Sequence, residues 1–111
     1  MDNREYIRQR LVQIKKIVTK DKKGETFSII PRDKNRNFMR EYGLQLNDVK
    51  NIILALSVPD YIKGPEEDDG GYAGEVWFFA PRFCGIKLYV KLRIQDNKLI
   101  VCISIHENGL Y

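Results

Sequence analysis

The chain contains few of the residues that build metal sites and disulfide frameworks. Its 111 residues include two cysteines, one histidine and one tryptophan. Cys84 and Cys102 have no C-x-x-C spacing, and a single histidine does not complete a zinc site with them. The acidic run 66–69 also lacks the spaced oxygen ligands and the central glycine of a calcium-binding loop. The sequence therefore predicts no metal ion and indicates no cofactor.

Long apolar segments are absent as well. The longest uncharged apolar stretches, such as residues 76–80, have the length of a strand, whereas a membrane-spanning helix needs about 20 residues. We therefore expect no membrane partner. The chain begins Met-Asp-Asn-Arg-Glu and not with an apolar signal segment, so we expect a cytoplasmic protein with both thiols reduced. The length suits a single domain over residues 1–111.

Positive charge is concentrated in the first part of the chain. Residues 1–40 contain 12 Lys or Arg against 5 Asp or Glu, whereas residues 41–111 contain 7 against 10. This asymmetry favours a polyanion or an acidic protein as the partner of the amino-terminal half, although many helices are basic for solubility alone.

The clearest pattern in the chain is a strand over residues 86–94. Because successive strand residues point to opposite faces, its five apolar residues form one row. The second row consists of Lys87, Tyr89, Lys91 and Arg93. Three cations beside an aromatic ring suit phosphates and bases, so this row is a candidate RNA-binding surface. The alternative interpretation is an ordinary solvated face of an antiparallel sheet.

A second strand is expected over residues 99–106, paired with the first as a hairpin. One of its rows is Leu99, Val101, Ile103 and Ile105, and the other is Ile100, Cys102, Ser104 and His106. A two-residue turn at Asp96-Asn97 keeps one face of the hairpin wholly apolar. In that register Leu92 lies opposite Val101, Lys91 opposite Cys102, Tyr89 opposite Ser104 and Lys87 opposite His106.

Apolar spacing and helix-ending residues locate the other elements. The expected helices cover residues 4–19, 33–42 and 48–56. Asp33 and Asn47 are their expected amino-terminal caps. The expected short strands cover residues 26–30 and 75–79. The fold class is α+β, with amino-terminal helices packed on a three-stranded antiparallel sheet.

Residues 60–74 are expected to form a mobile, exposed loop. They contain Gly64-Pro65, four consecutive carboxylates at 66–69 and Gly70-Gly71, a composition typical of turns and loops. The simplest interpretation of the carboxylates is solvent exposure. The alternative is an electrostatic gate beside Lys63 that discourages non-specific RNA.

The polar face suits metal-free RNA cleavage if Glu75 and Trp77 share it. A base removes the ribose 2′-OH proton, the oxygen attacks phosphorus, and an acid protonates the leaving 5′ oxygen. Tyr89 orients or deprotonates the 2′-OH, Glu75 is the alternative base, and His106 is the candidate acid. The structural alternatives are a polar residue at a strand end for His106 and a core residue for Trp77.

Several motifs follow one another in a recognisable order. They are DVKNIILALS at 48–57, DYIK at 60–63, EVW at 75–77 and LYVKL at 88–92, preceded by the basic QIKKIV at 13–18. From Asn47 onward this order resembles the motility quorum-sensing regulator toxins, MqsR, within the wider RelE-like group of bacterial messenger-RNA interferases.

The resemblance implies a RelE-like fold and a metal-independent endoribonuclease that cleaves mRNA and is neutralised by a cognate antitoxin. It places Lys63 and Tyr89 at the positions of two active-site residues of the family. The chain departs from the family at Gly74, where the family has glutamine before its acidic residue. The ending at 104–107 is similar to the histidine-bearing carboxyl terminus of other RelE-like toxins. The cleavage sequence and any part played by the ribosome stay open.

Together these observations predict a toxin-type endoribonuclease. The expected catalytic residues are Lys63, Glu75, Tyr89 and His106, and the expected RNA-binding residues are Lys87, Lys91, Arg93 and Trp77. Two other functions use the same features. A non-catalytic RNA-binding module needs the cations and the rings but no acid or base, and a protein-interaction domain needs only the basic first helix.

Overall fold

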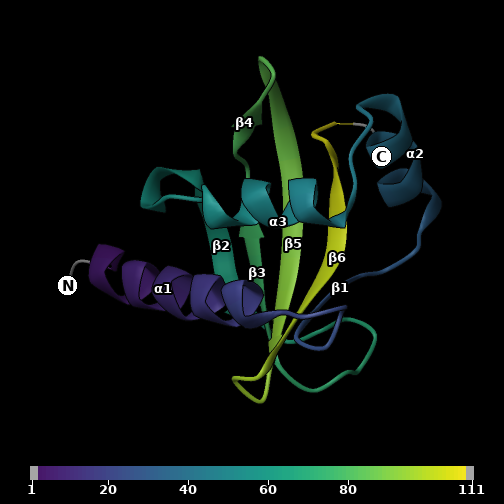
Figure 1. The fold of residues 1–111 in the computed structure, drawn as a ribbon. Helices are drawn as coiled ribbons and strands as arrows, with labels where there is room; N and C mark the ends of the chain where they lie inside the picture. The colour runs from purple at the N-terminus through teal and green to yellow at the C-terminus, as the bar shows by residue number, and fades with distance from the viewer. Residues whose placement is uncertain (1–2, 110–111) are drawn as a thin grey trace.

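A computed structural model describes residues 3–109, which form an α+β domain with a mixed six-stranded sheet (Figure 1). The helices are α1 (Arg4–Lys20), α2 (Asp33–Glu41) and α3 (Leu46–Leu54), with a short 3₁₀ turn, η1 (Val58–Asp60). The strands are β1 (Phe27–Ile29), β2 (Tyr61–Glu66), β3 (Glu75–Phe79), β4 (Arg82–Phe83), β5 (Ile86–Gln95) and β6 (Leu99–Glu107). Helices α1 and α3 lie across one face of the sheet, whereas α2 lies beside β6.

The sheet is larger than the three antiparallel strands predicted from the sequence, and that prediction is wrong. Its order is β1-β6-β5-β3-β2, with β4 paired to β5, and β1 runs parallel to β6. β1 adds to the sheet beside β6, where Phe27 pairs opposite Ile100 and buries its side chain. β2 falls within the predicted loop, and its irregular pairing with β3 at the edge of the sheet tolerates Pro65.

Apolar spacing located the helices correctly, but both predicted caps are wrong. The first helix ends one residue later than predicted and buries its apolar row at Ile7, Leu11, Ile14, Ile17 and Val18. Asp33 is the first helical residue of α2, after the cap Arg32. Helix α3 begins after Gln45, whose backbone N–H donates to the Asp48 carboxylate at 2.8 Å. The carboxylate of Asp48, the third helical residue, therefore caps the start of α3, and Asn47 does not.

The β5–β6 hairpin has a different register from the predicted one. Asp96 and Asn97 do adopt positive φ, at 53° and 55°, but pairing resumes at Gln95 and Leu99, so Lys98 stays in the loop. The register shifts once more between Lys91 and Leu92. As a result Ile100, Cys102 and Ile105 enter the core under the helices, while Val101 and Ile103 lie on the other face.

The error has a physical cause, because both faces of this sheet bury apolar residues. The main core between helices and sheet includes Trp77, Phe79, Leu88 and Leu92. A second, smaller cluster on the opposite face contains Val76, Phe78, Val101 and Ile103. The assumption of one wholly apolar face therefore did not apply to β6.

Asp21 fixes the turn that leads from α1 into β1. Its carboxylate accepts hydrogen bonds from the backbone N–H groups of Thr26 at 2.8 Å and Phe27 at 3.0 Å. It also pairs with Lys50 of α3 at 2.5 Å. Burial raises the pKa of Asp21, but the hydrogen bonds from Lys50 and from these backbone groups outweigh it and lower the pKa to about 2.

The Asp21→Asn variant should lose about 2 kcal/mol of unfolding free energy at pH 7, because the charged acceptor of several hydrogen bonds is replaced by a neutral one. The pKa is lower in the folded state, so the carboxylate stabilises the fold above its ordinary pKa and ceases to do so below pH about 2. Urea unfolding at pH 7 and near pH 2 should show the difference between variant and wild type shrinking with acid. The exposed Asp33→Asn change is the control, and an equal loss in it would contradict this role.

Candidate nucleic-acid interface

A cavity of about 180 Å³ opens on the sheet face that α1 and α3 leave uncovered. It is lined by Arg32, Lys34, Tyr89, Lys91, Ser104 and His106, and we call it the cationic pocket. Four of these residues come from β5 and β6, and the other two come from the start of α2. The pocket therefore joins segments that lie far apart in the sequence.

Pairing between β5 and β6 sets the floor of the cationic pocket. The observed register places Tyr89 opposite His106 and Lys91 opposite Ser104. The two rings of the first pair stack, with centroids 5.3 Å apart and planes at 27°. In the predicted register Tyr89 would have faced Ser104 instead. The longer turn and the bulge between Lys91 and Leu92 together place the phenol opposite the imidazole.

Asn35 holds the start of α2 against β6. Its side chain is 1 % exposed, and its amide nitrogen donates to the carbonyl oxygens of Ile30 and Ile103, each at 2.9 Å. Its amide oxygen accepts from the N–H of Ile105 at 2.8 Å. The side chain thereby continues the pairing of β6 beyond the end of β1. This anchor brings Arg32 to the pocket, where Nη1 donates to Ser104 Oγ at 3.2 Å.

The pocket combines positive charge with a buried imidazole. Lys91 is largely buried, with a side chain 16 % exposed, and His106 is 5 % exposed. His106 Nδ1 lies 3.0 Å from the carbonyl oxygen of Glu107. Because a carbonyl oxygen only accepts, Nδ1 holds the hydrogen of this bond. In the neutral ring, Nε2 is then the nitrogen that carries no hydrogen.

Arg93, an expected RNA-binding residue, is engaged within the protein. Its Nη1 lies 2.6 Å from Asp68 Oδ2, and both side chains are 8 % exposed. The ring of Tyr72 lies 4.7 Å from its guanidinium carbon. The Arg93 hydrogen bond lowers the pKa of Asp68, with a further contribution from the N–H of Gly70. Residues 67–74 have no strand, as predicted, but Asp68 anchors them over part of the polar face.

Lys63 and Lys87 lie on exposed positions away from the pocket floor. Lys63 pairs opposite Phe78, the residue opposite Lys91, so it lies on the same face two strands away. Its Nζ lies 4.4 Å from the Phe78 ring and 3.4 Å from Glu66. Lys87 pairs with Arg82 of β4. Neither lysine lines the cationic pocket.

Glu75 and Trp77 lie on the other face of the sheet, so the shared-face arrangement required by the sequence hypothesis does not occur. Trp77 pairs opposite Leu92, which places it in the main core, fully buried. Its Nε1 donates to Glu75 at 3.3 Å, and Arg10 contacts the same carboxylate at 3.3 Å. Sequence could not decide this orientation, because both rows of β3 are apolar.

Sequence reasoning missed Arg32 and Lys34. Their approach to Tyr89 and His106 depends on the parallel pairing of β1 with β6, which local patterns do not reveal. The only available signal was the concentration of basic residues in RDKNR at 32–36, directly after a short strand. That signal indicated charge but gave no position on the sheet.

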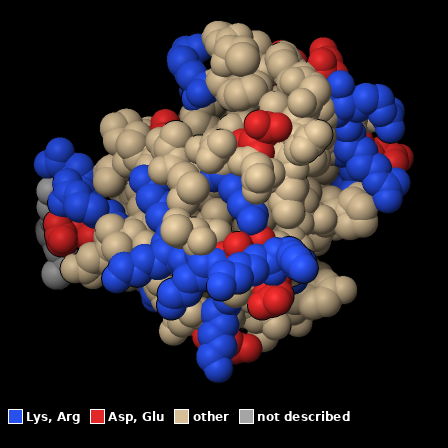
Figure 2. Space-filling view, in the orientation of Figure 1, with Lys and Arg blue, Asp and Glu red and all other residues tan. Residues whose placement is uncertain are grey.

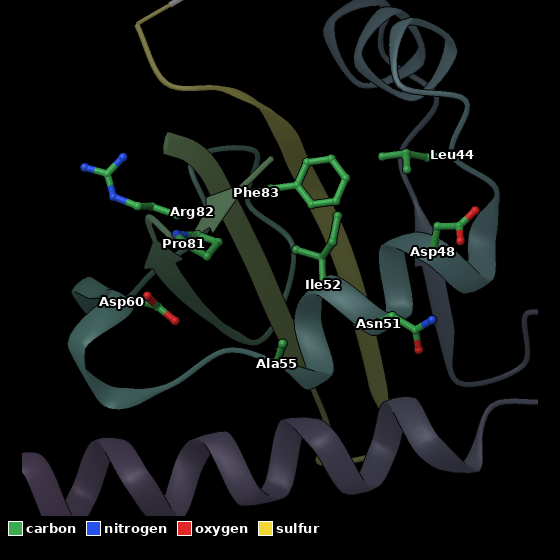
Figure 3. A pocket seen from close by; sticks show the side chains of 9 residues that line it. All are labelled: Leu44, Asp48, Asn51, Ile52, Ala55, Asp60, Pro81, Arg82 and Phe83. Carbon is green, nitrogen blue, oxygen red and sulfur yellow. The ribbon is translucent and has the colours of Figure 1, made fainter. Parts of the chain in front are cut away.

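Two further surface features lie on the helix side of the molecule. Lys and Arg gather along the outer side of α1 (Figure 2), where Arg8, Lys16 and Lys20 are exposed. A groove of about 630 Å³ lies between α3 and β4 (Figure 3). Its two carboxylates, Asp48 and Asp60, accept hydrogen bonds from nearby backbone N–H groups. None of the expected site residues lines this groove.

No family model matches this chain, and neither does any curated protein sequence. Over residues 3–109, no helix is long and apolar enough to cross a membrane. Within the same range, no group of three or more His, Cys, Asp or Glu side chains is placed to hold a metal ion. The geometry of the cationic pocket is therefore the main guide to function.

Proposed function

We propose that this protein is an endoribonuclease that cleaves mRNA at the cationic pocket without a metal ion. The observation that supports this most is the convergence of Arg32, Lys34 and Lys91 around the stacked rings of Tyr89 and His106. Cations hold a phosphate and stabilise the charge that develops on it, while the two rings offer groups for proton transfer.

The proposed reaction is a transesterification within the RNA strand. The scissile phosphate binds between the three cations, and Tyr89, as its phenolate, removes the proton from the 2′-OH. The 2′ oxygen then bonds to phosphorus, and the bond from phosphorus to the 5′ oxygen breaks. The imidazolium form of His106 donates its Nε2 proton to that leaving oxygen. The products are a 2′,3′-cyclic phosphate and a free 5′-OH.

The proposal changes two roles that the sequence suggested. Glu75 has no part in it, because its carboxylate lies on the opposite face of the sheet, beside Trp77 and Arg10. Arg93 is assigned to holding the acidic loop through Asp68. Lys63 remains as an RNA contact further along the same face.

The resemblance to MqsR toxins adds a biological setting to the proposal. In that setting the protein is the toxin of a toxin–antitoxin pair, with mRNA as substrate and a cognate antitoxin as protein partner. The matching motifs include LYVKL at 88–92, which contains Tyr89 and Lys91 of the pocket. The exposed basic band on α1 is a surface that an acidic partner can contact without covering the pocket.

Inducible expression in a bacterial host, followed by mapping of new RNA ends, tests the proposal with ribosomes present. Wild type should generate discrete new 5′ ends and arrest growth, and Lys91→Ala should lose most of these ends. The matched control is Lys16→Ala, which removes an exposed cation on the opposite side of the molecule and should cut like wild type. RNA binding without new ends, at adequate protein levels, would favour a non-catalytic RNA-binding module instead.

A further inference from the structure

A second hollow of about 190 Å³ lies next to the cationic pocket. It is lined by Lys34, Asn37, Phe38, Glu41, His106 and Glu107, and we call it the α2 hollow. Lys34 and His106 line both cavities. The imidazole therefore borders both cavities.

The α2 hollow differs from the cationic pocket in charge. Glu41 and Glu107 both line it, and carboxylates repel phosphate groups, so a second phosphate is not its natural ligand. Burial raises the pKa of the neighbouring Tyr42, and the charges of Glu41 and Glu107 raise it further. The negative field of the two carboxylates is thus concentrated at this end of α2.

The groups in the hollow match the edge of a base. Ionised carboxylates only accept hydrogen bonds, and they accept well from exocyclic amino groups such as cytosine N4. Arg40 contacts the Asn37 oxygen at 3.4 Å, so the amide nitrogen is the group that Asn37 can offer to a ring acceptor. The buried ring of Phe38 supplies an apolar wall. A cavity of this size takes one planar base.

The proposed mechanism fixes which base this is. His106 protonates the 5′ oxygen, which belongs to the nucleotide downstream of the cut. In-line attack places that nucleotide on the side of the phosphorus opposite the 2′-OH that Tyr89 contacts. We infer that the α2 hollow binds the base immediately 3′ of the cleaved bond and selects bases that carry an exocyclic amino group, with Glu41 and Glu107 as the acceptors. This inference rests on the proposed endoribonuclease function.

Short DNA oligonucleotides with a single ribonucleotide test the inference, because only one bond in them can be cut. Adenine at the 3′ position should be cut about 10-fold faster than unsubstituted purine, which lacks only the amino group, because one good base contact discriminates by this amount or more. Uracil should resemble the unsubstituted purine. In Glu41→Gln and Glu107→Gln the ratio of adenine to purine should fall toward one. The remote, exposed Glu25→Gln serves as the matched control and should keep the wild-type ratio.

The outcomes separate this inference from the function on which it rests. Equal cleavage rates by wild type for every base 3′ of the cut would overturn base selection but would still support the endoribonuclease function. If the purified protein cuts nothing, the all-deoxy versions of the same oligonucleotides give a binding measurement. If wild type binds the purine oligonucleotide more weakly than the adenine one, and Glu41→Gln binds both equally, the result would support the hollow as a base site without catalysis. Equal affinities would overturn the inference.

Discussion

Replacing His106 by glutamine should lower the single-turnover rate of RNA cleavage by about 10²–10⁴-fold, the usual contribution of one positioned acid or base. The Glu107 carbonyl accepts a hydrogen bond from Nδ1, so the proposal assigns proton donation to the leaving 5′ oxygen to Nε2 of the protonated ring. Glutamine retains a polar side chain of similar length but cannot supply that proton as an acid. Because His106 is buried, thermal unfolding of the variant should be measured beside the rate.

A substrate with sulfur in place of the scissile 5′ oxygen separates acid catalysis from positioning. A thiolate leaves without protonation, so the His106→Gln variant should recover most of its rate on this substrate. Tyr89→Phe should also be slow, because the phenol acts on the 2′-OH, but sulfur should not rescue it. An equal defect of His106→Gln on both substrates would show that the imidazole does not act as the acid.

The part of the site on β5 could be predicted from sequence because its polar and apolar residues alternate without interruption. Backbone geometry then assigns Tyr89 and Lys91 to one face whatever the neighbouring strands do. β6 offered no such alternation, since residues 99–103 are all apolar or cysteine. The pattern therefore fitted more than one register, and the longer turn and the bulge that together pair Tyr89 with His106 could not be anticipated.

The rest of the site depends on contacts between distant segments. Arg32 reaches Ser104 because β1 pairs with β6 and because Asn35 bonds to the backbone of Ile103 and Ile105. Each of these contacts joins segments about 70 residues apart. Local sequence patterns do not predict pairing over such a separation. The same limit explains why the α+β class was predicted correctly and the number of strands was not.

Removing the Arg93 side chain should destabilise the protein by about 3–5 kcal/mol, since it leaves the largely buried Asp68 carboxylate without its cation. Arg93 Nε is itself buried with no hydrogen-bond partner, so the Asp68 contact at 2.6 Å is the main compensation for burying the guanidinium. Urea unfolding of Arg93→Ala at pH 7 measures the loss. Lys91→Ala is the contrast, because its partner Asp69 is almost fully exposed and such a pair contributes little stability.

The pH dependence of the unfolding free energy of Asp68→Asn shows whether the Arg93–Asp68 ion pair stabilises the protein. Arg93 lowers the pKa of Asp68 in the folded state, so the carboxylate contributes stability above its ordinary pKa of about 3.9 and loses it as pH falls through the folded value. The unfolding free energies of wild type and Asp68→Asn should therefore differ most at neutral pH and converge in acid. If this buried pair holds residues 67–74 in place, Asp68→Asn should also speed proteolysis within that loop at neutral pH. An unchanged cleavage rate there would mean that Asp68 does not anchor the loop over the polar face.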